Sequence, residues 1–299
     1  MLKNYFKIAW RNIMKNKVFS FINVIGLTIG LSASFVIGLM VYYDYTFDNF
    51  HKDGDRTYRI VTDFTGPDGK FYNSGVTLAL KGAIEENSNF EAISEFYRER
   101  PMTVENRAND LKFRLPQFVI FADQNYFDVF DYNFIAGDAS SPLSNPNEVI
   151  LTKERAQKYF PNEQISNILG KTIVYNDSIN TKVTGIVENF NGRTDIVFQE
   201  FISHPTLLQT RLRENIIGKN WNNTNSSSQL FVKLNPNADM AAINSRFKEL
   251  ATEHMDENDI KYGEERIFKL QPLADIHFNE NYGIYDWSNG RASKSLLKN

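Results

Sequence analysis

The chain opens with two adjoining patterns, a short segment with a helical apolar stripe and then a long uncharged run. In residues 1–17 apolar side chains recur three and four residues apart, and Trp10 is the largest of them. Basic side chains follow one another every four residues on a separate face, and they are Lys3, Lys7, Arg11 and Lys15. This pattern predicts an amphipathic helix with an apolar face for lipid or a protein partner and a basic face for anionic headgroups. The alternative, a plain positively charged flank, requires no apolar stripe.

The uncharged run covers residues 18–43, which is 26 residues without a charge. At ~1.5 Å per residue a helix of that length measures about 39 Å, enough to cross a hydrocarbon core of about 30 Å with some tilt. The apolar part of a secretory signal is shorter, at about 7–15 residues, and residues 31–33 match a cleavage site poorly. We therefore expect a transmembrane helix. The basic flank before it and Asp44 after it predict a cytoplasmic N-terminus, with residues 44–299 outside.

Within the spanning segment small residues recur at four-residue intervals, and they are Gly26, Gly30, Ser34 and Gly38. Such a stripe lets the backbone of a second helix approach closely. One glycine pair would mean little, since glycine is common in spanning helices, but four small residues in register favour a packed partner helix. The chain has no second hydrophobic run of spanning length. We expect the partner helix to come from another molecule or from a part of the protein outside this chain.

Beyond residue 44, segments with the alternating apolar pattern of strands are interspersed with segments that carry the apolar stripe of a helix. This succession predicts an α+β globular region. Strands are expected at residues 57–64, 90–97, 102–107, 112–121, 171–175, 181–190, 229–234 and 266–273. Helices are expected within residues 75–87, 123–130, 151–160 and 238–251. Strand–helix–strand patterns thus stand at both ends of a middle block that is richer in strands and turns. We interpret residues 44–115 and 229–290 as one βαβ-type subdomain, and residues 116–228 as a β-rich subdomain inserted into it.

Charge separates the anchor from the body. Residues 1–43 carry five basic residues and no acid, whereas residues 44–299 carry 28 basic residues against 36 acids, a net charge of −8. An acidic body argues against nucleic acid as a partner, because phosphate binding needs clustered lysine and arginine. The chain has no cysteine, which excludes disulfides, thiolate metal sites and cysteine nucleophiles.

The sequence offers no catalytic, cofactor-binding or metal site. The segment NILGKT resembles the end of a phosphate-binding loop, but Ile165 stands where that loop requires its first glycine. The four histidines are far apart in the chain, and none forms an HExxH pair. DENDIKYGEE lacks the order of a calcium-binding EF-hand loop, and no Gly-x-Ser-x-Gly elbow occurs. We therefore expect a protein that is not an enzyme.

A family resemblance begins at the membrane boundary. The segment YYDYTFDNFHKDGDRTYRI, with the basic NYFKIAWRNIMKNK before the span, resembles the MacB/FtsX-type ABC transporter permeases, especially the form common in Bacteroidetes. FADQNYFDVFDYNFIAGD, NEVILTKERAQKYFPNE, LGKTIVYND and KVTGIVENF resemble successive blocks of the periplasmic core domain of that family. LQPLADIHF and GRASKSLL resemble its return to the membrane, and the order of the blocks carries the identification.

The resemblance implies an inner-membrane permease with a cytoplasmic N-terminal helix, a first span, a periplasmic domain and three further spans. It implies an ABC ATPase as the partner that binds ATP, so this chain itself is expected to bind no cofactor. It further implies a homo- or heterodimer with another permease, contact with membrane lipid, and a periplasmic or outer-membrane partner. ATP-driven motion would pass through the membrane helices to the periplasmic domain for export or envelope remodelling. Residues 291–299 would begin the return to the membrane in an apparently truncated permease.

Roles follow for particular residues. Residues 1–17 would contact the ATPase or the inner leaflet through Lys3, Lys7, Trp10, Arg11 and Lys15. The stalk between the span and the periplasmic domain would include Asp44, Phe47, Asp48 and Phe50, although solvated juxtamembrane charge also explains the two acids. One alternative function is the extracytoplasmic sensor domain of a signalling receptor, which a small-ligand pocket with convergent polar groups would favour. A membrane-anchored adhesion or binding domain is a third, and it leaves the stripe of small residues unexplained.

Overall fold

The computed structural model of the chain describes residues 2–214 and 220–286, and it divides into two compact units. The first unit runs to Thr46, and the second begins at Phe47. The expected return to the membrane at residues 291–299 lies outside the described residues.

The first unit consists of the helices α1 (Leu2–Lys15) and α2 (Lys17–Tyr45), which are separated at Asn16. α2 has 29 residues, none of them buried. Among the described residues it is the one helix long and apolar enough to cross a membrane. Both helices match the bounds expected from the sequence to within two residues.

The sheet of the second unit begins with two strand–helix–strand repeats. The first comprises β1 (Thr57–Gly66), α3 (Leu80–Ile84) and β3 (Phe90–Tyr97). The second comprises β12 (Ser228–Leu234), α7 (Met240–Glu253) and β13 (Glu265–Pro272). The strands lie in the order β13–β1–β12–β3 with every neighbouring pair antiparallel, which is the ferredoxin-like arrangement. Residues 57–97 and 228–272 are called the outer lobe below.

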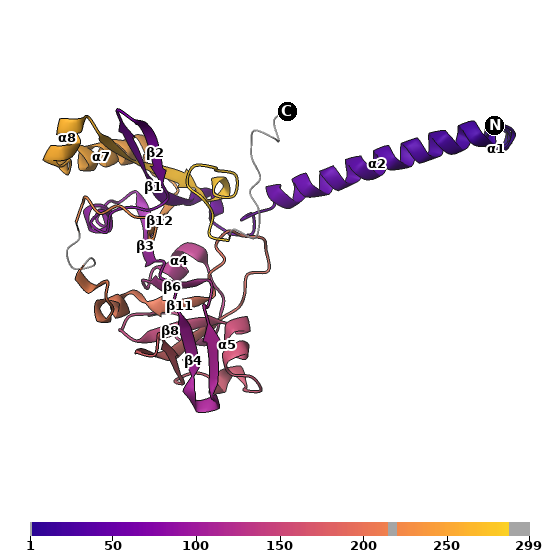
Figure 1. Ribbon diagram of the computed structural model, residues 1–299. Helices are drawn as coiled ribbons and strands as arrows, with labels where there is room; N and C mark the ends of the chain where they lie inside the picture. Colours follow the sequence, from indigo (N-terminus) through magenta and orange to yellow (C-terminus); the bar gives the residue numbers. More distant parts are fainter. Residues whose placement is uncertain (1, 215–219, 287–299) are drawn as a thin grey trace. The chain divides into compact units, whose positions relative to one another are not determined.

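The apolar face of α7 closes the core of the outer lobe. Ile243, Phe247 and Leu250 are spaced for one side of a helix and are buried. The Asp239 side chain caps the first turn by accepting two backbone N–H bonds. Two further elements complete the lobe, the strand β2 (Gly69–Asn73), which pairs with β1, and the helix α8 (Glu257–Tyr262). Figure 1 shows α7 and α8 beside β1 and β2 at one end of the second unit.

Residues 98–227 form the rest of the sheet and are called the inserted lobe. Two residue pairs join it to β3, namely Phe96 with Ala122 and Tyr97 with Phe121. The strands then follow in the order β6–β11–β8–β10–β9–β4–β5, with β7 paired to β10. Their bounds are β4 (Thr103–Asn106), β5 (Leu111–Arg114), β6 (Val119–Ala122), β7 (Phe134–Gly137), β8 (Glu148–Thr152), β9 (Thr172–Tyr175), β10 (Ile179–Val187) and β11 (Glu200–Ser203). The helices are α4 (Tyr126–Phe130) and α5 (Lys153–Tyr159).

Two further apolar clusters hold these parts together. One lies within the inserted lobe, where Ala156 and Tyr159 of α5 pack on buried residues of β8 and β10. The other joins the lobes and is rich in aromatic rings, including Phe96 and Phe231 of the outer lobe and Tyr126 and Phe201 of the inserted lobe. The two lobes therefore share one continuous sheet and one core. This mixed α+β architecture confirms the fold class expected from the sequence.

The pairing of β4 differs from the expected domain division. The sequence placed residues 102–115 in the βαβ-type subdomain, whereas β4 pairs with β9, and Val104 lies in the core of the inserted lobe. Alternation along a strand says which face is buried but not which strand lies beside it. The insertion therefore starts near residue 98 rather than at residue 116.

A second difference concerns residues 112–121, which the sequence predicts as one strand. The structure has two strands there, β5 and β6, separated by residues 115–118. Leu115 and Phe118 both adopt left-handed backbone conformations, with φ of 48° and 64°. Pro116 between them has no N–H to offer a ladder. The segment turns away from the sheet edge as a loop.

Candidate functional site

The second unit receives the chain through residues 47–56, which we call the junction segment. The Phe47 side chain is only 4% exposed, and its ring stacks on the His277 ring with a centroid distance of 3.6 Å. His277 Nδ1 lies 3.1 Å from a carboxylate oxygen of Asp195, which is fully buried. Burial raises the pKa of Asp195, although His277 beside it acts in the opposite direction. The first residue of the segment is thereby fixed against the turn after β13 and, through His277, against Asp195 of the inserted lobe.

Asp48 ties the junction segment to the loop before β11. Its backbone N–H donates to the Arg193 carbonyl at 2.8 Å, and its carboxylate accepts from the Thr194 hydroxyl. The residue is 4% exposed and has a φ of 58°, so the chain makes a sharp, buried turn here. His51 Nε2 lies 3.6 Å from the same carboxylate. A surface stalk would leave these side chains in water, whereas here they are part of the folded domain.

Phe50 fits against a glycine in that same loop. A Cβ atom built on Gly192 would lie 2.0 Å from Phe50 Cδ1, far closer than atoms can approach. The Phe50 ring also lies 5.0 Å from the Phe190 ring, centroid to centroid. Glycine is therefore the residue that lets the ring lie flat on the loop backbone.

Charged residues hold the end of the junction segment. Arg56, in the 3₁₀ turn η1 (Gly54–Arg56), lies 2.7 Å from carboxylate oxygens of both Asp53 and Glu91, and it donates to the Leu234 carbonyl. Arg56 lowers the pKa of Asp53 through this hydrogen bond. The two acids in turn raise the pKa of Arg56.

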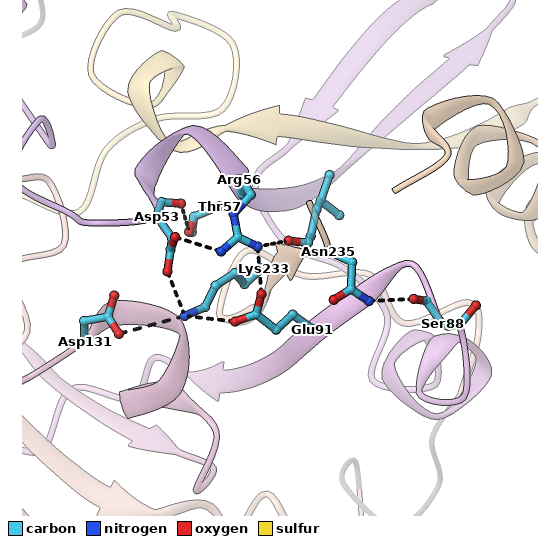
Figure 2. Close-up of polar contacts among 9 residues, drawn as sticks. Asp53, Arg56, Thr57, Ser88, Glu91, Asp131, Lys233 and Asn235 are labelled. Atoms are coloured by element: carbon cyan, nitrogen blue, oxygen red, sulfur yellow. Dashed lines mark hydrogen bonds and ion pairs between the residues drawn. The ribbon is translucent and has the colours of Figure 1, made fainter. Parts of the chain in front are cut away.

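Lys233 completes this group, which we call the junction clamp. Its side chain is 6% exposed, and its Nζ lies 3.5 Å from Asp53, 3.7 Å from Glu91 and 3.9 Å from Asp131. Figure 2 shows the five charged side chains converging from η1, the start of β3, the end of β12 and the end of α4. The clamp residues are Asp53, Arg56, Glu91, Asp131 and Lys233. At the same corner the Asn235 side chain donates to the Ser88 carbonyl (Figure 2).

The arrangement suits mechanical work better than chemistry. Among the described residues there is no group of three or more potential metal ligands. The charges of the clamp are mutually paired, so they leave no group poised to attack or to move a proton. A chain segment that enters a domain through a ring stack, a buried turn and paired charges cannot swing independently of that domain.

The other residues singled out from the sequence lie in the first unit. Asp44 is in α2, and Lys3, Lys7, Trp10, Arg11 and Lys15 are in α1, where all five are exposed. Gly26, Gly30, Ser34 and Gly38 lie in α2, and a Cβ on any of these glycines would meet nothing within 4 Å. The structure thus leaves both faces open, and their partners stay a prediction.

Sequence reasoning missed most of the junction. It named Phe47, Asp48 and Phe50 as a stalk but not the residues that receive them. Lys233 carried a weak signal, because it is a charged residue within the otherwise apolar run QLFVKL. Gly192 and Asp195 carried none, since their roles depend on contacts with Phe50 and His277, which are more than eighty positions away in the chain.

A cleft of about 540 Å³ lies at the other end of the central strands. β3 is antiparallel to β12 and β6, and β6 is parallel to β11. The end of β3 and the starts of β6, β11 and β12 therefore lie together, at the same end of these central strands. Residues from just beyond these strand ends line the cleft, among them Arg98, Arg100 and Phe118.

Comparison with known proteins identifies relatives of the whole arrangement. A family model described as "MacB-like periplasmic core domain" matches residues 20–250. A domain of a protein described as a permease, from Porphyromonas gingivalis, has a similar structure with a TM-score of 0.62 and 18% identity, covering 84% of this chain and 99% of its own. At this identity the likeness concerns the fold. No curated protein sequence matches the chain.

Two more solved structures are similar over much of the chain. The periplasmic region of MacB from Actinobacillus actinomycetemcomitans has a TM-score of 0.49 and 16% identity, covering 76% of this chain and 93% of its own. The extracellular domain of the ABC-type transporter YknZ from Gram-positive bacteria has a TM-score of 0.44 and 15% identity, covering 72% of this chain and 99% of its own.

Proposed function

This chain belongs to the family with a MacB-like periplasmic core domain, which is part of ABC-type transporter permeases, and we propose that it transmits ATP-driven motion from the membrane to its extracytoplasmic domain. In this role it is a permease subunit, or the N-terminal part of one, that serves export or envelope remodelling. The family match begins within α2 and ends within α7, so most of the helix and most of the domain are matched together.

The observation that carries the proposal is the junction segment. Motion passes from a helix to a domain only if the connection resists bending. Here Phe47 stacks on His277, Asp48 is buried in a turn, and Arg56 is held by two carboxylates. Each contact falls within ten residues of the start of the second unit. A flexible tether would be solvated and rich in glycine and serine instead.

The proposal also assigns places and partners. The basic flank supports a cytoplasmic N-terminus in the bacterial inner membrane, with residues 44–299 in the periplasm. The exposed basic face of α1 would contact the ABC ATPase or anionic lipid. The small-residue stripe of α2 would pack against a span of a second permease chain, in a homo- or heterodimer. A periplasmic or outer-membrane partner would receive the motion.

The first test is co-purification of the tagged full chain from its native membrane in mild detergent, with identification of bound proteins by mass spectrometry. An ABC ATPase is the expected companion. Replacing Lys7 and Arg11 by glutamine should reduce its recovery several-fold. The matched control replaces Lys70 and Arg114, two exposed cations of the second unit, and should leave recovery unchanged. Recovery of a kinase, or of no ATPase, would overturn the proposal.

A second test addresses the transmission of motion. Because the chain has no cysteine, a single introduced cysteine can carry a spin label in each copy of the purified complex. We expect the distance between labels at Lys70 in the two copies to change when ATP is trapped. A four-residue Gly-Ser insertion after Thr46 should abolish this change, whereas the same insertion at the exposed Ser140 should preserve it. An unaltered change after the Thr46 insertion would contradict transmission through the junction.

A sensor domain is the second candidate, and one observation favours it. The cleft of about 540 Å³ presents polar and charged side chains, as a ligand-sensing domain requires. A sensor would couple that cleft to a kinase or to a signalling coiled coil. Recovery of such a partner in the first test would decide for the sensor.

A further inference from the structure

Four loops and the segment that carries Tyr285 and Asp286 form the cleft at the far ends of the central strands. The four loops follow β3 and precede β6, β11 and β12, so each of them begins or ends at a strand that the shared sheet holds in place. Arg98 and Arg100 come from the first loop, Gln117 and Phe118 from the second, and Phe198 from the third. A cleft built on the ends of adjacent strands has walls that cannot shift independently.

Within residues 2–214 and 220–286, the arginines of this cleft have no carboxylate partner. The Arg98 guanidinium makes a cation–π contact with the Tyr285 ring, 5.0 Å from its centroid. Arg100 is exposed and has no ion pair among those residues. Of the two acids that line the cleft, Glu99 is paired with Arg211 at 2.7 Å, and Asp286 has an interaction of its own. Within the described residues neither Arg98 nor Arg100 forms an ion pair with these acids.

A buried arginine adds to the positive potential. Arg59 is fully buried and also lies against the Tyr285 ring, 5.6 Å from its centroid. It donates to the Gln271 side chain, the Gly283 carbonyl and the Tyr285 hydroxyl, all of them neutral acceptors. Burial lowers the pKa of Arg98, and the positive charges of Arg59 and Arg100 act in the same direction. An anion beside Arg98 would relieve this repulsion.

The opposite wall is rigid. The Phe118 carbonyl accepts from the Gln199 N–H at 2.9 Å, and the Gln117 carbonyl accepts from the Arg155 side chain at 2.9 Å. Arg155 is itself 3.4 Å from the fully buried Glu200. Left-handed backbone at Leu115 and Phe118 costs energy and persists only where surroundings enforce it, and such strain is frequent at ligand sites.

We infer that this cleft, the arginine cleft, binds the oxyanion of a small organic ligand, with its carboxylate or phosphate against Arg98 and Arg100. The planar guanidinium fork suits both oxyanions because each offers two oxygens at matching separation. A volume of about 540 Å³ accommodates a compact organic molecule. The Phe118, Phe198 and Tyr285 rings supply apolar surface for the body of that molecule. The site is independent of the proposed transport function.

The test is isothermal titration calorimetry of the full chain in a neutral detergent, with phenyl phosphate, benzoate and inorganic phosphate as probes. Phenyl phosphate or benzoate should bind saturably and at least about tenfold more tightly than inorganic phosphate, because only the first two bury a ring. Their relative affinities distinguish a phosphate ligand from a carboxylate ligand. Titration with hexaglutamate addresses an acidic peptide, and tighter binding of that peptide would overturn the small-ligand assignment.

Three variants locate the binding. Arg98→Gln should weaken the tighter probe about tenfold or more, since a charge-assisted hydrogen bond is lost. Arg100→Gln affects an exposed residue, does not threaten the fold, and should weaken binding in the same direction. Arg114→Gln removes an exposed charge outside the cleft and should have no effect. Unchanged binding in both cleft variants, or no saturable binding of either aromatic probe, would refute the inference.

Discussion

The same central strands end in two charged regions with opposite arrangements. At one end Arg56 and Lys233 are surrounded by three carboxylates, and every cation has an anion within 4 Å. At the other end Arg98 and Arg100 have no carboxylate partner among the described residues. Both regions are built at strand ends of one sheet, so the difference lies in how the charges are paired.

This difference in pairing shows that charged side chains can either stiffen a connection or bind a ligand. Paired charges at the junction clamp fix the geometry of the connection and leave nothing to attract a ligand. At the arginine cleft, cations that have no carboxylate partner within the described residues add little to stability but attract an anion. The charges that stabilise the structure near the cleft are those of the buried pair Arg155 and Glu200, behind the cleft wall. Mutations at the two ends should therefore separate stability from binding.

The largest effect is expected at that deeper pair. Arg155→Met leaves the Glu200 carboxylate buried without its cation and releases the Gln117 carbonyl. Breaking a buried ion pair costs about 3–5 kcal/mol, and we expect about 3 kcal/mol here. Denaturant unfolding of the full chain in detergent measures it, with Lys248→Met on the exposed side of α7 as the control. A loss no greater than that of the control would show that the pair does not support the cleft.

The next effect contrasts the two ends directly. Lys233→Met removes a buried cation from three carboxylates and should cost about 2 kcal/mol, less than Arg155→Met because those acids are partly exposed. Arg98→Met loses one contact with an aromatic ring and should cost under about 1 kcal/mol. The same unfolding measurement compares them. Equal losses of unfolding free energy in the two variants would contradict the view that paired charges stabilise the clamp more than the arginines stabilise the cleft.

A smaller effect is expected where the junction segment touches a loop backbone. Gly192→Ala forces the Phe50 ring to move, and overpacking of this kind costs about 1–2 kcal/mol. In the double variant with Phe50→Ala the clash disappears, so adding Gly192→Ala to Phe50→Ala should cost almost nothing. A double-mutant cycle on unfolding free energies measures this coupling. Additive costs would mean that the two residues do not meet.

The smallest effect concerns the pH dependence of stability at Lys81, whose ammonium pairs with Asp123 just after β6. Burial lowers the pKa of Lys81, but Asp123 and Glu95 outweigh it, and the net shift is upward. A raised pKa in the folded state means that this stabilisation is complete below about pH 10.5 and is lost as pH rises through the raised value. We expect less than about 1 kcal/mol. Lys81→Met should flatten the alkaline loss of unfolding free energy, and an identical pH profile in the variant would exclude the contribution.

Local patterns predicted the parts of this molecule that local forces determine. The uncharged run gave α2, and the apolar spacing of residues 238–251 gave α7 with its inward Phe247. The order of strands and helices also predicted an insertion between the two halves of a βαβ-type lobe. These features depend on neighbours within a few positions in the chain.

Features that depend on distant partners could not be predicted. Arg56 meets Glu91 and the Leu234 carbonyl, and no periodicity connects those three positions. The break at residues 115–118 was also missed, because it interrupts an otherwise regular strand pattern where Pro116 and two left-handed residues turn the chain. That break forms one wall of the arginine cleft, so the cleft could not be predicted from the sequence.

The two ends of the inserted lobe lie side by side in the sheet, so the whole lobe could be removed or replaced. Tyr97 and Ser228 face each other in the ladder between β3 and β12, and the Arg98 N–H bonds to the Ser227 carbonyl at 2.9 Å. A two-residue Asn-Gly turn could therefore connect β3 to β12 and close the outer lobe directly. Phe96 and Phe231 would then be exposed to solvent, so both would be replaced by polar residues. The reverse operation grafts a foreign module at the same position, provided that its surface covers Phe96 and Phe231. Related proteins could thus differ in the inserted lobe while keeping the same outer lobe and junction segment.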